Sequence, residues 1–217
     1  MSYAPSARAT PSPGHSYGGA MRTLRTVALV TAPPLLLAVA GLVHPRHLTA
    51  STAAHWAALH VALLPVFPLL TLGLLVPLWG RPARDLDGAL TVLAWAGCLG
   101  YAAYYSGLDA VAGISAGTVA SHGVHGAVGW LFSTGDELGR AGVYALTVAA
   151  LAAAAVLRRR HGVRVLPGAA VVLGACWSFL DSHIFWPRGV FTMVAFAVGF
   201  GLLSVAASRR SGRLTNP

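Results

Sequence analysis

Residues 26–60 read TVALVTAPPLLLAVAGLVHPRHLTASTAAHWAALH, and this stretch decides the class of protein. Its first part, Thr26 to Val43, carries no charged residue. About 20 apolar residues, each adding about 1.5 Å, are needed to cross a hydrocarbon core of about 30 Å, and this run nearly reaches that length. The second part, residues 44–60, contains four histidines: His44, His47, His55 and His60. The stretch predicts a retained membrane-spanning helix that ends in a histidine-rich surface.

The composition extends this prediction to the whole chain. Of 217 residues, 56% are hydrophobic and 10% are charged, and the mean hydropathy is +0.67. A soluble domain carries roughly 25% charged residues, so lipid is the natural solvent for this chain. The net charge of +9 comes from arginines in short clusters between apolar runs. That distribution is typical of membrane-protein loops, and it excludes a nucleic-acid-binding protein.

Apolar runs of spanning length recur along the chain and predict an all-α bundle of six transmembrane helices. Pro33 and Pro34 in the first run, and Pro65 and Pro68 in the second, should kink their helices because proline removes backbone hydrogen bonds. Pro187 suits the first turn of the last helix. The predicted spans are Thr26–Val43, Ala53–Trp79, Ala89–Gly107, Leu138–Leu157, Pro167–Phe185 and Val190–Ala207.

The arginines give the orientation. If the N-terminus is cytoplasmic, the outer side keeps only Arg46, Arg140 and Arg188 of the 15 arginines. Such an excess of positive charge on one side follows the positive-inside rule. We therefore predict a multi-pass protein of the cell membrane with both termini in the cytoplasm and the lipid bilayer as its main partner.

Three parts of the chain fall outside the predicted spans. Residues 1–20 lack the apolar content to fold and predict a disordered cytoplasmic tail, and residues 209–217 a basic cytoplasmic tail. The domain between them is 21–208. Within it, the glycine-rich segment of about 108–137 could extend the third helix, lie along the interface or re-enter the membrane. We expect an extracytoplasmic cap or loop with some helix.

This topology gathers most histidines and acidic residues at the outer surface. Ionisable groups in or near the membrane are costly and are therefore functional candidates. The candidate metal ligands are His44, His47, His55, His60, Asp181 and His183. The candidate pocket residues are Trp56, Tyr104, Tyr105, Asp109, Ser178 and Arg188.

No local metal signature occurs among these residues. The chain has no H-E-x-x-H, H-x₃-H or C-x-x-C motif, so a site must be assembled from several helices. His55 and His60 are five apart and do not share a helix face, whereas Trp56 and His60 do. Asp181 is the favoured carboxylate, with Ser178, Arg188 or an outer histidine as its partner. We expect His44 or His47, His60 and Asp181 to line one cavity.

The sequence leaves the activity open. The leading interpretation is an outward-facing His/Asp-lined pocket that binds a ligand, possible cofactors being a metal ion or a haem held by His60 and His183. The first alternative is a small-solute or proton transporter. The second is a non-catalytic accessory or scaffold subunit with a membrane-protein partner, or a homo-oligomer. No nucleophile–base pair can be named, so whether the protein is an enzyme is undecided.

Overall fold

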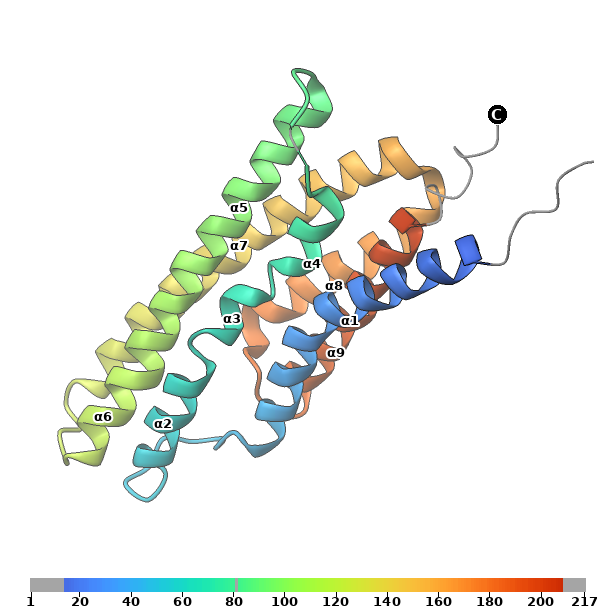
Figure 1. The fold of residues 1–217 in the computed structure, drawn as a ribbon. Helices are drawn as coiled ribbons and strands as arrows, with labels where there is room; N and C mark the ends of the chain where they lie inside the picture. Colours follow the sequence, from blue (N-terminus) through green and yellow to red (C-terminus); the bar gives the residue numbers. More distant parts are fainter. Residues whose placement is uncertain (1–13, 81, 209–217) are drawn as a thin grey trace, which may run out of the picture.

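The computed structural model describes residues 14–80 and 82–208, which are almost entirely helical and contain no strand (Figure 1). The α-helices are α1 (Gly14–Val43), α2 (Ala53–Leu63), α3 (Val66–Leu69), α4 (Leu72–Leu75), α5 (Leu86–Leu108), α6 (Ala116–Ser121), α7 (Val128–His161), α8 (Leu166–Ser182) and α9 (Arg188–Ser208). The shorter elements are the 3-10 helices η1 (Val76–Leu78) and η3 (Gly162–Val165) and the π-helix η2 (Asp109–Ser115).

Within the described residues, four helical stretches are long and apolar enough to cross a membrane. They are Gly18–Val43, Leu86–Ser121, Val128–Ser182 and Arg188–Ser208. The pair Ala53–Leu63 and Val66–Leu78, bent by 41°, makes a fifth if it is counted as one span. The predicted all-helical fold class is therefore confirmed, together with four to five helices of membrane-spanning length and composition.

The bend in the second predicted span lies at its prolines, as the sequence predicts. The α2 helix ends at Leu63, and Pro65 follows at the break before α3. Because proline has no N–H group, it cannot continue the hydrogen-bond ladder of α2. The predicted span Ala53–Trp79 therefore forms a chain of short helices instead of one straight one.

Two segments outside the predicted spans are helical. Residues 14–20, expected to be disordered, form the first turns of α1. The segment 108–137, expected as a cap or loop, begins by continuing α5 through η2 and α6. A turn at 122–127 follows, and α7 begins at Val128. Of the three possibilities weighed for it, this corresponds to an extension of the third helix. The tail at 209–217 lies outside the described residues.

Glycines allow neighbouring helices to approach closely. A Cβ atom added at Gly97 of α5 would lie 2.7 Å from the carbonyl oxygen of Ala145 in α7. In the same way, Gly168 of α8 and Gly199 of α9 each face the other helix's backbone. Small residues at such contacts are usual where helices pack in lipid. Cys98 and Cys176 are buried and unbridged.

The bundle has two chemically different ends (Figure 1). We call one of them the histidine end, because it contains His44, His60 and His183. These residues lie at the end of α1, in α2 and between α8 and α9. The arginine end contains the start of α5 and the turn between α7 and α8, where Asp87 pairs with Arg159 and Arg160. The beginning of α1 and the end of α9 also lie there (Figure 1).

Candidate metal site

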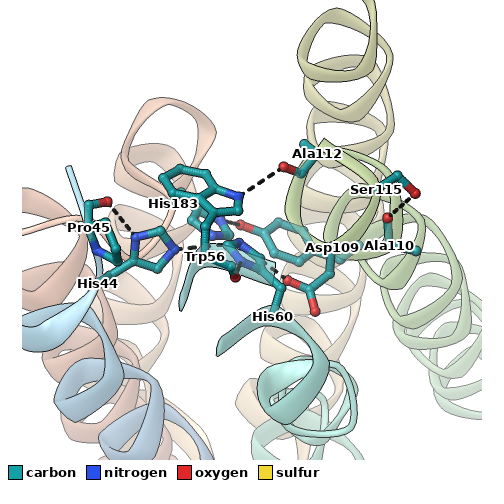
Figure 2. A network of polar contacts seen from close by, with 10 residues as sticks. His44, Pro45, Trp56, His60, Asp109, Ala110, Ala112, Ser115 and His183 are labelled. Atoms are coloured by element: carbon teal, nitrogen blue, oxygen red, sulfur yellow. Dashed lines mark hydrogen bonds and ion pairs between the residues drawn. The ribbon is translucent and has the colours of Figure 1, made fainter. Parts of the chain in front are cut away.

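Three histidines far apart in the sequence meet at the histidine end. His44 follows α1, His60 lies in the last turn of α2, and His183 follows α8. One ring nitrogen of each lies within 4.8 Å of the others. Figure 2 shows their side chains pointing toward one another from these different elements.

Backbone carbonyls fix the protonation of two of these rings. His44 Nδ1 lies 2.8 Å from the Pro45 carbonyl oxygen, and His60 Nδ1 lies 2.7 Å from that of Trp56. Because a carbonyl oxygen only accepts, each Nδ1 must carry the hydrogen and donate it. In a neutral imidazole, the Nε2 atom then keeps its lone pair. The two Nε2 atoms face each other at 3.5 Å.

His183 is held by the phenol of Tyr105, whose hydroxyl lies 2.7 Å from His183 Nδ1. The His183 backbone has a φ of +42°, which is uncommon for a residue other than glycine. This turn of the chain directs the imidazole inward beside the ring of Phe67, at a centroid distance of 5.4 Å. When Nδ1 donates to the phenol oxygen, Nε2 of His183 is free to bind a ligand.

Burial keeps His44 and His183 uncharged at neutral pH. Removal from water lowers the pKa of His44 to about 4, despite the opposing effect of its hydrogen bond to Pro45. Burial also lowers the pKa of His183 well below its ordinary value, and the neighbouring imidazoles add to the effect. A neutral imidazole is the form that binds a metal ion.

The imidazole of His60 packs against the indole of Trp56 and against the backbone of η2 at Gly113. The Trp56 ring stacks on it at a centroid distance of 5.2 Å, and Trp56 Nε1 donates to the Ala112 carbonyl oxygen at 3.1 Å. Gly113 also packs against the imidazole, since a Cβ atom added there would come within 2.2 Å of His60 Cδ2. Only a glycine leaves room for the imidazole at this position.

The π-helix η2 brings a carboxylate to the same place. Asp109, its first residue, is 0% exposed. Its Oδ1 atom lies 3.8 Å from His60 Nε2, and neither carboxylate oxygen accepts a hydrogen bond from the described part of the chain. Buried polar atoms are nearly always satisfied, and π-helices recur at functional sites. Asp109 is therefore a strong functional candidate.

The spacing of the imidazoles is close to that of a metal site. With one side of the nitrogen triangle at 3.5 Å and the others at the 4.8 Å limit, a point equidistant from all three lies about 2.6 Å from each. A Zn–N bond is about 2.0–2.1 Å long. An inward shift of about half an ångström per ring would give ligation distances.

A polar recess of about 270 Å³ adjoins one of the three histidines, His183. Tyr105 and His183 form part of its wall, and its charged lining residues are Asp136, Arg140 and Asp181. His44, His60 and Asp109 are buried and do not line the recess, so His183 is the member of the group that borders it.

The structure leaves the remaining predicted metal ligands and three of the pocket residues outside the group of three imidazoles. His47, His55 and Tyr104 are exposed. Ser178 and Arg188 line a different groove, of about 590 Å³, between α8 and α9. Of the residues predicted to line one cavity, His44 or His47 with His60 and Asp181, the structure brings His44 and His60 together. Asp181 lies in the adjoining recess, is 67% exposed, and pairs with Arg188 at 4.0 Å.

From the sequence we predict Asp109 only as a pocket residue and favour Asp181 as the carboxylate. A signal for Asp109 was present, because it lies one helical turn beyond Tyr105 in a run of small and apolar residues. The π-helix that places Asp109 next to α2 cannot be predicted from the residue types. Phe67 and Phe185, which pack their rings near His183, were not singled out either.

Comparison with known proteins adds no relative, because no family model, no curated protein and no solved structure matches this chain. The functional argument therefore rests on the geometry of the site.

We predict that Trp56→Phe lowers the free energy of unfolding by about 1–3 kcal/mol, because the buried Ala112 carbonyl loses its donor. The matched control is Trp130→Phe, at a side chain that is 79% exposed, where a change below about 0.5 kcal/mol is expected. Unfolding in mixed detergent micelles, followed by circular dichroism, measures both. Equal stability of the two variants would contradict this role of the Trp56 hydrogen bond.

Proposed function

We propose that this is a multi-pass membrane protein that binds a divalent transition-metal ion through His44, His60 and His183. The observation that carries the proposal is the pair of Nε2 atoms 3.5 Å apart, each with its Nδ1 hydrogen committed to a backbone carbonyl. Two lone pairs that face each other in a buried space repel unless a cation lies between them. Carbonyl groups that orient ligating histidines in this way are typical of metal sites.

Imidazole ligands favour an ion of intermediate hardness such as Zn²⁺. Imidazole suits zinc, iron, nickel and copper, whereas thiolates and thioethers select Cu(I). Both cysteines of the chain are buried in α5 and α8, apart from the group of three histidines. Zn²⁺ is accordingly the first ion to test.

The same geometry does not support haem. A bis-histidine haem needs two imidazoles on opposite faces of a broad macrocycle. The rings of His60 and His183 are nearly parallel, at 8°, with centroids 6.1 Å apart. The His44 ring lies 5.0 Å from one and 6.1 Å from the other, which leaves no room for a macrocycle between them.

We further propose six membrane spans, with both termini in the cytoplasm of a cell-membrane protein. The helical stretch Val128–Ser182 contains a 3-10 turn at Gly162, whose φ is +78°, and α7 packs against α8 beyond it. Counted as two spans, this stretch raises the total to six. The clustering of arginines near Asp87 supports a cytoplasmic arginine end.

In this orientation the metal site faces outward. An ion would reach it through the recess lined by Asp136 and Asp181, without crossing the bilayer. The protein would then bind its metal from the extracytoplasmic side.

His60→Ala tests the metal site. We expect purified wild-type protein to bind about one Zn²⁺ per chain and His60→Ala to lose more than the roughly 10–100-fold in affinity that removal of an outer-shell partner costs. His125→Ala, at an exposed histidine in the turn at 122–127, is the control and should bind like the wild type. Isothermal titration and elemental analysis give affinity and stoichiometry. Equal zinc affinity in both variants would refute the proposal.

The topology has its own test. Reporter fusions after His47 and after Arg84 should report opposite sides of the membrane, because the bent pair α2–η1 lies between them. Reports from the same side would contradict the six-span arrangement.

A further inference from the structure

Two imidazole nitrogens and one carboxyl group that can each donate an electron pair lie near one another at the histidine end. His44 Nε2 and His60 Nε2 hold lone pairs because their Nδ1 atoms donate elsewhere. The third donor is the carboxylate of Asp109, whose Oδ1 atom faces His60 Nε2 at 3.8 Å. Both carboxylate oxygens lack a hydrogen bond, although the residue is fully buried. An isolated buried carboxylate is strongly unfavourable, so the group is either protonated or paired with a cation, and a metal ion would supply that cation.

The separations fit a metal ion better than a shared proton. A charge-assisted N–H···O bond between imidazolium and carboxylate is about 2.7–2.9 Å long. The separations here are 3.5 Å between the two Nε2 atoms and 3.8 Å between His60 Nε2 and Asp109 Oδ1. Neighbouring ligand atoms around a tetrahedral zinc are about 3.3 Å apart, given bonds of about 2.0–2.1 Å. Both separations slightly exceed those of a loaded metal site. Asp109 lies outside the group of three histidines whose ligand atoms are all within 4.8 Å of one another, so its carboxylate would have to move inward on metal binding.

We infer that Asp109 is the fourth protein ligand of the metal held by His44, His60 and His183. This inference rests on the proposed function and adds to it a closed coordination sphere of three imidazoles and one carboxylate. The carboxylate cancels one of the two charges of a buried divalent ion, which three neutral imidazoles cannot do. Four protein ligands are typical of structural zinc sites, whereas catalytic sites keep one position open for water.

Contacts of η2 with α2 fix the position of the Asp109 carboxylate. Asp109 begins η2, and the same short helix supplies the Ala112 carbonyl that holds Trp56 and the Gly113 surface that receives the His60 ring. Ser115 Oγ donates to the Ala110 carbonyl oxygen at 2.9 Å, which satisfies a further backbone group of the π-helix (Figure 2). The position of Asp109 relative to His60 is therefore set by contacts on both sides of η2.

A closed sphere gives the metal a structural role. Its ligands come from the segment after α1, from α2, from η2 and from the corner between α8 and α9. Binding of one ion would tie these segments together at the histidine end. Because a ligand that binds only the folded state stabilises it, zinc should raise the melting temperature of the protein.

The experiment compares Asp109→Asn with the wild type and with Asp181→Asn, a nearby carboxylate that is 67% exposed. Co²⁺ serves as a spectroscopic substitute, because its visible bands report the number and type of ligands. We expect Asp109→Asn to bind Zn²⁺ at least about tenfold more weakly, to change the Co²⁺ spectrum and to lose most of the zinc-dependent rise in melting temperature. Asp181→Asn should behave as the wild type, and Asp109→Glu should recover part of the affinity.

Two outcomes would overturn the inference while leaving the metal site in place. One is unchanged Zn²⁺ affinity in Asp109→Asn. The other is weaker binding with an unchanged Co²⁺ spectrum, which would make Asp109 a distant charge and not a ligand. If Asp109→Asn fails to fold, the wild-type Co²⁺ spectrum decides, because a six-coordinate pattern contradicts a closed four-ligand sphere. Failure of the wild type to bind any metal refutes the proposed function itself.

Discussion

Two hydrogen bonds from imidazole to backbone carbonyl determine how the buried histidines of this protein face each other. By donating Nδ1 hydrogens to Pro45 and Trp56, His44 and His60 direct their Nε2 lone pairs at each other in a buried space. Because the acceptors are backbone atoms, the choice of tautomer follows from the course of the chain after α1 and within α2. The proposed metal site depends on this pairing, since the opposite tautomers would place two N–H groups face to face.

The arrangement of the site also requires the backbone of α2 to lie close to those of η2 and α6. The imidazole of His60 occupies the space that a side chain at Gly113 would fill, and a Cβ at Gly117 would lie 2.8 Å from the backbone nitrogen of Ala57. These two glycines let α2 lie directly on η2 and α6. Without that approach, the ring of Trp56 could not reach the Ala112 carbonyl, and Asp109 would not face His60.

The sequence predicts those parts of the structure that depend on local pattern. Apolar runs and prolines give the helices and the bend after Leu63, because both act through the length and hydrogen bonding of a single segment. The prediction that Trp56 and His60 share a face, with His55 on another, follows from helical periodicity and agrees with their burial.

Other features depend on tertiary structure and are hidden from such reasoning. Asp181 attracts attention because it stands beside histidine and aromatic residues, yet its side chain lies in the recess and pairs with Arg188. Asp109 reaches His60 through a π-helix, and nothing in the residue types of 109–115 distinguishes a π-helix from an α-helix. The inward turn at His183 similarly requires a positive φ at a residue that is not glycine.

The most direct test of this account is X-ray absorption at the zinc edge of the wild-type protein after zinc loading and removal of excess ion. We expect retained zinc with a first shell of three imidazole nitrogens and one oxygen at about 2.0–2.1 Å. Outer-shell scattering from the imidazole rings should confirm the three histidines. Loss of the zinc during purification, or a six-coordinate shell of oxygen atoms without imidazole scattering, would contradict it.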